Sequence, residues 1–327
     1  MIYLIYLNTV WLSINKIIKL ILVSLLILTF FYKIVNADNT GIIKISKHNW
    51  SSQLVGAEVI GELMKMVGEK VEYVTMDNQK VYQSMAEGEI DIVHEIWEGA
   101  FGFSYEKAKA SGGIEEILTY NITIREDWWY PNYVEKECPG LPAWQALAKC
   151  SAIFVEEGSD GKGVFIGGPV DWIKHDAKKI AALDMNFVVK NVVSAEAIWV
   201  ELDAAVEQNK PIVIFNWSPN FIGAKYEGKF VEFPKHDPKC SIDPAWGVNP
   251  NAVYDCGNPT NEYLKLAVNK DFKKNHPKGY KVIKQINFSG SDIEKMANYI
   301  ETDNMEVSSA AKQWLKENKK KWSMWVK

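Results

Sequence analysis

The chain has 327 residues, of which 47% are hydrophobic and 24% charged, and its formal net charge is −4. A chain of this length and apolar content can bury a sizeable core, so its composition excludes a disordered or fibrous protein and predicts two lobes or domains. The acidic balance disfavours a nucleic-acid partner, because the only basic run after the first residues is the lysine triplet at 319–321.

The first 37 residues have the pattern of a secretory signal peptide. Lys16 and Lys19 precede an apolar run at 20–31, and Ala37 supplies the small residue typical of a cleavage site. The alternative is a membrane anchor, since residues 1–12 are also mostly apolar, but the run at 20–31 is short for a spanning helix. We expect export to the periplasm. Removal of the leader takes away three lysines and no acid, so the net charge goes from −4 to −7.

Strands and helices alternate from residue 41 onward, which is typical of an α/β fold with a parallel or mixed sheet covered by helices. Apolar periodicity predicts strands at 42–45, 71–76 and 91–97, a helix capped by Ser51 or Ser52, and another helix at 78–86. The stretch 120–133 is expected to be extended, because Pro131 disfavours a helix there, and to carry the chain into a second lobe.

The second lobe is expected to repeat this alternation before the chain returns to the first. The predicted elements are a helix at 141–150, a strand at 152–157, a helix opened by 167–172, a strand at 187–189, a helix capped by Ser194 and a strand at 211–217. The rest is predicted helical at 260–269, 291–301 and 308–320, with Ser291 and Glu294 as a capping box. The domain prediction is therefore a leader at 1–37, a first lobe at 38–130 and 234–327, and a second lobe at 131–233.

Tryptophan is unusually frequent, with 13 in the chain, and three of these residues follow strands. Trp50, Trp97 and Trp217 come at the ends of apolar runs, and open α/β sheets bind ligands at the carboxyl edge of their strands. Several indole faces can hold a trimethylammonium group, which has no N–H to donate, through cation–π attraction of about 0.5 to 2 kcal/mol per face. Other tryptophans lie at helical spacing and are expected in the core, namely Trp199, Trp314 and Trp322.

The cysteines form two close pairs, separated by 12 and 16 positions. In an oxidising compartment, proximity favours the disulfides Cys138–Cys150 and Cys240–Cys256 among the three possible connectivities. The Asp- and Asn-rich segment closed by the second pair could supply oxygen ligands to a structural Ca²⁺, the candidates being Asp237, Asp243, Asn249 and Asp255. The competing interpretation is a disulfide-tied loop with Asx turns, because the spacing is not that of an EF-hand.

Five short motifs occur in a fixed order along the chain: His48-Asn-Trp-Ser-Ser-Gln53, Glu95-Ile-Trp-Glu-Gly99, Trp128-Trp-Tyr-Pro-Asn-Tyr-Val134, Gly167-Gly-Pro-Val-Asp-Trp172 and Asn216-Trp-Ser-Pro219. With these motifs the chain resembles the periplasmic glycine betaine/choline substrate-binding proteins of ABC importers. It is most similar to the branch that binds trimethylamine N-oxide, which shares the cysteine-closed segment with Asp-Pro-Ala-Trp-Gly-Val-Asn-Pro at 243–250. The resemblance covers residues 40–327.

The resemblance implies an α/β, two-lobed type II periplasmic-binding-protein fold that closes on its ligand at a hinge. It implies a tryptophan cage with Trp50 and Trp97 from the first lobe and Trp217 from the second. Further candidates are Trp144 as a fourth wall, Asp171 as a polar contact and, ranked below them, Trp129. The ligand would be a small methylated ammonium osmolyte, either trimethylamine N-oxide or glycine betaine, or else choline or dimethylsulfoniopropionate.

The expected partner of such a protein is the membrane permease of an ABC importer, and the protein itself would act as a monomer without a cofactor. We expect no enzyme activity, because the sequence has no GxSxG, HExxH, GxxxxGK[ST] or strand-linked GxGxxG motif. Two alternatives remain open. One is a secreted enzyme that acts on a methylamine with Glu98 or Asp171 as acid or base, and the other is a protein that binds carbohydrate by stacking it on tryptophan.

Overall fold

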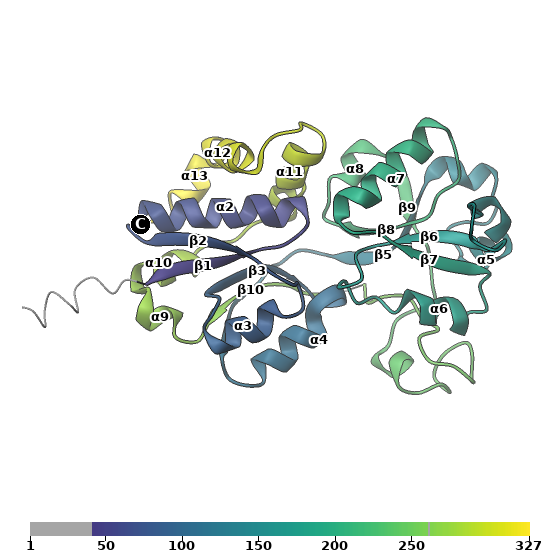
Figure 1. Ribbon diagram of the computed structural model, residues 1–327, viewed down its shortest axis with the longest axis horizontal. Coiled ribbons are helices and arrows are strands. Elements are labelled where there is room, and N and C mark those ends of the chain that lie inside the picture. The colour runs from purple at the N-terminus through teal and green to yellow at the C-terminus, as the bar shows by residue number, and fades with distance from the viewer. Residues whose placement is uncertain (1–40, 261) are drawn as a thin grey trace, which may run out of the picture. The chain divides into compact units, whose positions relative to one another are not determined.

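The computed structural model describes residues 41–260 and 262–327. Residues 42–327 form one compact unit that contains two five-stranded sheets, each covered by helices (Figure 1). We call each sheet with its helices a lobe. The predicted signal peptide and its cleavage site lie outside the described residues. Within residues 41–260 and 262–327, none of the helices is both long and apolar enough to cross a membrane.

The first sheet has the strand order β2-β1-β3-β10-β4. Strand β1 pairs in parallel with β2 and β3, whereas β10 runs antiparallel to both β3 and β4. Every residue of β3 and β10 is buried, as expected for central strands with both faces covered. The strands are β1 (Ile42–Lys47), β2 (Lys70–Thr75), β3 (Ile92–Trp97), β4 (Ile114–Thr119) and β10 (Leu264–Asn269).

The second sheet has the strand order β7-β6-β8-β5-β9. Strand β6 pairs in parallel with β7 and β8, and β5 runs antiparallel to β8 and β9. Both sheets are therefore mixed, which confirms the predicted α/β class. The strands are β5 (Arg125–Pro131), β6 (Gly163–Gly167), β7 (Phe187–Asn191), β8 (Ile214–Ser218) and β9 (Gly228–Phe230).

Helices lie on both faces of the first sheet (Figure 1). Helix α2 packs with α11 and α12 on one face, and α3 and α4 lie on the other. The helices of this lobe are α2 (Ser51–Met66), α3 (Val81–Glu87), α4 (Glu98–Lys109), α9 (Phe272–Asn275), α10 (Pro277–Ile283), α11 (Gly290–Glu301), α12 (Val307–Glu317) and α13 (Lys319–Trp322).

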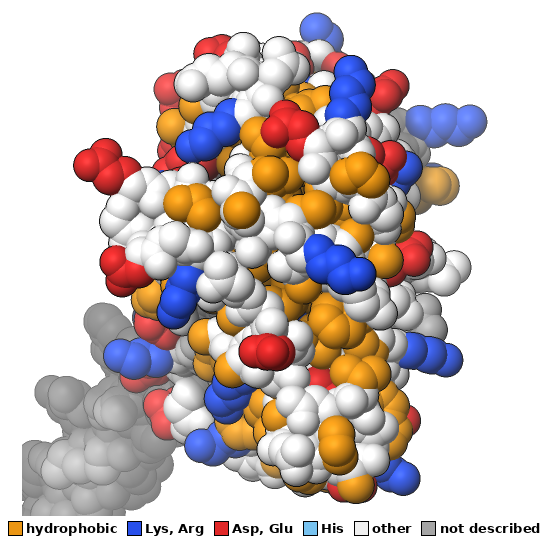
Figure 2. Space-filling model, turned by 90° about the vertical axis from the view of Figure 1, so that its right-hand side faces the viewer, with side chains coloured by type: hydrophobic (Ala, Val, Ile, Leu, Met, Phe, Trp, Pro, Cys, Tyr) orange, Lys and Arg blue, Asp and Glu red, His pale blue; other side chains and the backbone are white. Residues whose placement is uncertain are grey.

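In the second lobe, α7 and α8 cover one face of the sheet and α6 lies on the opposite face (Figure 1). The end face of this lobe carries lysines and acids interspersed among hydrophobic and polar side chains (Figure 2). Its helices are α5 (Trp144–Lys149), α6 (Asp176–Ala182), α7 (Ala195–Glu207) and α8 (Ile222–Lys225), with the short 3₁₀ turns η1 (Asn132–Lys136), η2 (Ser151–Phe154) and η3 (Pro238–Ser241).

Three predicted elements have a different secondary structure. The predicted helix at 260–269 is wrong, because its last six residues form β10, whose apolar positions Leu264, Leu266 and Val268 alternate with the period of a strand. The predicted strand at 152–157 is also wrong, since η2 occupies its beginning. The strand lies instead at β6, which ends at Gly167 where we expected a helix to begin, and α6 begins only at Asp176.

The predicted helix caps are partly correct. Ser194 caps α7 by accepting a hydrogen bond from the backbone N–H of Ala197. The capping box of α11 is formed by Ser289 and Asp292, two residues before the predicted pair. Helix α2 begins directly after Trp50, so Ser51 lies inside the helix and does not cap it.

The chain passes between the two sheets twice, between β4 and β5 and between β9 and β10. Because β5 pairs along its length with β8 and β9, the first crossing lies at 120–124, earlier than the boundary expected after residue 130. The segment after residue 234 also differs from the predicted division into lobes. The Nδ2 of Asn249 donates to the carbonyl of Ala182 in α6 over 2.7 Å, so this segment contacts the second lobe, although we placed it in the first.

The structure contains the two disulfides Cys138–Cys150 and Cys240–Cys256. The first joins the end of η1 to the end of α5, and the second closes the irregular segment between β9 and β10. Neither pair lies among the side chains that line the cavity described below.

Candidate ligand-binding site

A small cavity lies where the two lobes meet. Six of its eight lining side chains are aromatic, and its free volume of about 10 Å³ is roughly that needed by one water molecule. Each lobe contributes four of these side chains. They are Trp50, Trp97, Ala100 and Phe101 from the first lobe, and Glu126, Trp172, Phe215 and Trp217 from the second.

The ends of strands position the first-lobe aromatic residues. Trp50 follows β1 and is the last extended residue before α2. Trp97 ends β3 and immediately precedes α4, which brings Phe101 to the same place one turn later. The carboxyl ends of the neighbouring strands β1 and β3 therefore deliver two indoles to one sheet edge, as the sequence predicted.

The second-lobe residues come from two strands and one loop. Phe215 and Trp217 are two residues apart on β8, so their side chains point to the same face of the sheet. Glu126 on β5 pairs directly with Trp217. Trp172 lies in the loop between β6 and α6.

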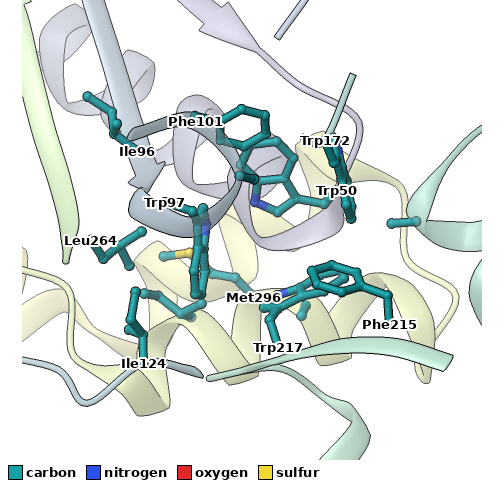
Figure 3. Packing of buried hydrophobic residues seen from close by; sticks show 14 of the residues in the cluster. Trp50, Ile96, Trp97, Phe101, Ile124, Trp172, Phe215, Trp217, Leu264 and Met296 are labelled. Carbon is teal, nitrogen blue, oxygen red and sulfur yellow. The ribbon is translucent and has the colours of Figure 1, made fainter. Parts of the chain in front are cut away.

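Ring geometry joins the aromatic groups of the two lobes (Figure 3). Trp50 stacks on Phe101 with ring centroids 5.6 Å apart. Trp172 lies edge-on to Trp50 at 5.9 Å and edge-on to Trp217 at 5.5 Å. Trp172 is thus the side chain that contacts indoles from both lobes, and such edge-to-face pairs are a favourable aromatic arrangement.

A single carboxylate oxygen orients the two first-lobe indoles. The Oε2 of Glu95 accepts hydrogen bonds from the Nε1 of Trp50 at 2.7 Å and of Trp97 at 3.4 Å, and from the hydroxyl of Ser52 at 2.8 Å. Glu95 is buried, and burial raises its pKa to about 7 although these three hydrogen bonds oppose the shift. Its backbone φ of 55° lies in the left-handed region, which is uncommon for a residue other than glycine.

A second set of polar contacts ties the lobes together beside the cavity. The Nδ2 of Asn78 donates to Oδ2 of Asp171 at 2.6 Å and to Oδ1 of Asn49 at 3.0 Å. The indole Nε1 of Trp172 donates to the same Asn49 oxygen at 3.2 Å. We call these four residues the interlobe bridge, because Asn49 and Asn78 belong to the first lobe and Asp171 and Trp172 to the second.

Comparison with known proteins identifies the family. Residues 41–317 match the model of the substrate-binding domain of ABC-type glycine betaine transport systems. The chain belongs to this family. It is also 38% identical over 324 residues to the trimethylamine N-oxide-binding protein of Pelagibacter ubique strain HTCC1062, an alignment that covers 96% of this chain and all of that protein.

Two solved structures of binding proteins have a similar fold. A lactococcal glycine betaine-binding protein, crystallised closed with glycine betaine, superposes with a TM-score of 0.64 at 22% identity and covers 87% of this chain and 99% of its own. A choline-binding protein in complex with choline gives a TM-score of 0.67 at 15% identity over 87% of this chain and 91% of its own. These likenesses confirm the periplasmic-binding-protein fold with a cleft between two lobes.

The cavity brings together three of the six predicted ligand residues. Trp50, Trp97 and Trp217 line the cavity. Sequence reasoning missed Phe101, Glu126, Trp172 and Phe215 as lining residues. Two of these carried a usable signal, since Phe215 lies two positions before Trp217 on a predicted strand and Trp172 closes one of the family motifs.

The other three predicted residues do not line the cavity. Trp129 is buried in β5, and its ring occupies the space that a side chain on Gly228 would need. Trp144 begins α5, where its backbone N–H donates to the carbonyl of Glu232. Asp171 belongs to the interlobe bridge, so its carboxylate faces Asn78 and not the aromatic rings.

The candidate Ca²⁺ ligands of this binding protein do not converge on one point. Within residues 41–260 and 262–327, no group of three or more acidic, histidine or cysteine side chains is suited to a metal ion. Oxygens of Asp237 and Asp243 accept hydrogen bonds from backbone N–H groups two residues ahead, and Asp255 accepts one from Asn249. Asp237 and Asp243 thereby form Asx turns, which supports the competing interpretation of this loop.

Proposed function

We propose that this protein captures a small methylated ammonium osmolyte in the aromatic cavity and delivers it to the permease of an ABC importer. The observation that carries the proposal is the convergence of Trp50, Trp97, Trp172 and Trp217 from two lobes on one small space. Indole faces attract a methylated cation electrostatically, and a desolvated site strengthens that attraction. The identity to a relative that binds trimethylamine N-oxide supports the same ligand class.

The size of the cavity supports a closing mechanism. Its free volume of about 10 Å³ suits roughly one water, whereas a trimethylammonium group has four heavy atoms. The lobes therefore have to separate before the ligand can be admitted, and the indoles of both lobes close around it afterwards. The interlobe bridge stabilises the closed arrangement, and the two crossings, between β4 and β5 and between β9 and β10, act as the hinge.

The one ionisable side chain of the lining favours an N-oxide over a carboxylate ligand. Oε1 of Glu126 pairs with Nζ of Lys174 at 2.5 Å, while Oε2 has no hydrogen-bond partner among the residues that the structure describes. Trimethylamine N-oxide has no carboxylate group. The carboxylate of glycine betaine would meet a like charge at the same place, which costs binding energy. We therefore rank trimethylamine N-oxide above glycine betaine.

Isothermal titration calorimetry with trimethylamine N-oxide, glycine betaine, choline and dimethylsulfoniopropionate tests this function. We expect trimethylamine N-oxide to bind most tightly, and Trp97→Ala and Trp217→Ala each to weaken its binding about tenfold or more. The uncharged isostere tert-butanol serves as the ligand control and should bind far more weakly. Failure of all four compounds to bind, or unchanged affinity in both variants, would contradict the proposal.

We further propose that the protein acts in the periplasm as a monomer without metal or cofactor, after cleavage of residues 1–37, and that it is not an enzyme. Neither acid considered for catalysis lines the cavity. Oε2 of Glu98 accepts a hydrogen bond from the backbone N–H of Tyr263 at 2.9 Å, and Asp171 is engaged by Asn78. Turnover of a methylamine would overturn this view. Binding of a neutral sugar without affinity for any methylated cation would favour a carbohydrate-binding protein instead.

A further inference from the structure

Two buried glutamates from different lobes lie against each other beside the aromatic cavity. Glu126 lies near the start of β5 in the second lobe, and Glu262 lies two residues before β10 in the first. Both face Gly99, at which an added Cβ would lie less than 3 Å from Oε2 of Glu126 and from Oε1 of Glu262. The two carboxyl groups therefore converge on a place where only glycine fits.

The charges around this pair do not balance. Nζ of Lys174, in the loop before α6, bonds Oε1 of Glu126 at 2.5 Å. Glu98 of α4 adds a further carboxylate whose charge acts on Glu262, and the charge of Glu126 contributes, after burial, to the raised pKa of Tyr82 in α3. One lysine thus faces three acids.

The hydrogen bonding around the pair is equally incomplete. Among the described residues, neither oxygen of Glu262 has a hydrogen-bond donor, and Oε2 of Glu126 also lacks one. Glu126 is 3% exposed and Glu262 5%, so solvent cannot satisfy these oxygens. Two ionised carboxylates in this position would be costly. A single proton held between them would remove one charge and provide the missing hydrogen bond.

We propose that Glu126 and Glu262 share one proton when the lobes are closed, and that ligand-driven closure takes this proton up from solution. The inference rests on the proposed function, since it assumes that the ligand closes the lobes. In the open protein, water reaches both carboxyl groups, and Glu262 ionises at neutral pH as an ordinary glutamate does. Closure removes that water and brings the carboxyl groups together, so one of them regains a proton.

The direction in which pH changes the affinity follows from the change in the surroundings of Glu262 when the lobes close. Burial, the neighbouring Glu126 and the more distant Glu98 raise the pKa of Glu262 above its ordinary value, and the nearby Lys174 only partly opposes them. The closed state therefore binds more protons than the open state at neutral pH. Affinity is greatest at low pH and falls as the pH rises, by up to about tenfold per pH unit for one proton.

Calorimetric titration of the whole protein with trimethylamine N-oxide at pH 7, in phosphate and in Tris buffer, counts these protons. Because the two buffers release protons with different enthalpies, we expect the binding enthalpy to vary with the buffer and to indicate uptake of about one proton. The dissociation constant should rise at least severalfold from pH 6.5 to 8.5. Glu262→Gln keeps a donor for Glu126 but cannot titrate, so we expect its binding enthalpy to be the same in both buffers.

The outcomes separate this inference from the function on which it rests. Binding by the wild type with an enthalpy that does not depend on the buffer overturns the shared proton and leaves the proposed function intact. Proton uptake that persists in Glu262→Gln assigns the proton to another group and also overturns the inference. Absence of binding by the wild type contradicts the proposed function itself. The wild-type measurement decides the matter even if the variant does not fold.

Discussion

The indole Nε1 of Trp50 donates a hydrogen bond to Oε2 of Glu95 over 2.7 Å, and the neighbouring Trp97 points its Nε1 at the same oxygen. All three residues belong to the first lobe, so this arrangement does not depend on closure. One buried carboxylate thereby fixes two walls of the cavity before a ligand arrives. Walls that are already ordered lose less conformational entropy on binding, which favours affinity.

Replacement of Glu95 separates its role as a hydrogen-bond acceptor from its charge. We expect Glu95→Ala to weaken binding of trimethylamine N-oxide about tenfold, because both indoles lose the group that orients them. Glu95→Gln retains an acceptor oxygen and should lose less than Glu95→Ala. Calorimetry on both variants measures the difference. Unchanged affinity in both variants would show that the indoles are held by packing alone, and equal losses would contradict the role of the acceptor oxygen.

The same carboxyl group should make stability depend on pH. Burial raises its folded-state pKa to about 7, above the ordinary value of 4.5 in the unfolded chain. The protonated form is therefore favoured in the folded protein, and its contribution to stability is complete below pH 4.5 and is lost as the pH rises through 7. Between pH 5 and 8 we expect the free energy of unfolding to fall by about 2 kcal/mol more in the wild type than in Glu95→Gln. Urea unfolding at both pH values would detect this, and parallel curves would refute it.

Trp172 and Trp144 provide a matched pair of tryptophans in the second lobe. Trp172 contacts indoles from both lobes in the cavity, whereas Trp144 begins α5 away from the lining. We expect Trp172→Ala to raise the dissociation constant for trimethylamine N-oxide about tenfold or more, and Trp144→Ala to leave it within about twofold. Fluorescence or calorimetric titration distinguishes the two. A larger rise of the dissociation constant in Trp144→Ala than in Trp172→Ala would show that Trp144 contacts the ligand.

The interlobe bridge should control how long the ligand stays bound. Asp171→Ala removes the acceptor that receives the Asn78 amide across the cleft. Because the bridge forms only when the lobes are together, we expect a dissociation rate several times faster and little change in association. Glu157→Ala, an exposed acid of the same lobe, is the control. Stopped-flow tryptophan fluorescence gives both rates, and an unchanged dissociation rate would exclude a role for the bridge.

Two helical glycines should respond to alanine in opposite ways. A Cβ at Gly56 in α2 would lie 2.5 Å from Cε1 of the buried His94, whose Nε2 is hydrogen-bonded to the carbonyl of Gln53 at 2.9 Å. The imidazole cannot move without losing that bond, so Gly56→Ala should cost about 1 to 3 kcal/mol of stability. A Cβ at Gly223 in α8 meets no atom within 4 Å. Its replacement should be neutral or slightly stabilising in chemical denaturation.

The sequence predicted the parts of the site that depend on local pattern. Trp97 ends a buried strand and Trp50 follows another strand of the same sheet, so sheet topology brings these two indoles to one edge, while Trp217 occupies a similar position near the end of β8 in the second sheet. Trp172 closes one of the family motifs, but its place in the cavity had no such local signal. Its loop has neither helical nor strand periodicity, and its orientation depends on Asn49, a residue of the other lobe.

The proximity of Glu126 and Glu262 could not be predicted from the sequence either. The two residues are far apart in the chain and come together only because β5 and β10 each lie next to a crossing between the lobes. The error at β10 has the same physical origin. Its alternating apolar positions have the period of a strand, but the strands that it joins are determined by β3 and β4, which lie on either side of it. Contacts with residues far away in the sequence therefore determine where β10 pairs. The strands β1, β2 and β3 follow one another closely in the chain, and their apolar patterns can be recognised in short stretches of sequence.

The insertion of β10 between β3 and β4 also constrains the order of assembly. The strands of the second sheet are contiguous, from Arg125 to Phe230, whereas the first sheet needs residues 264–269 to join its β4 edge. As the chain emerges from its N-terminus, every strand of the second lobe becomes available before the last strand of the first. The lobe that starts the polypeptide is therefore the later of the two to be completed.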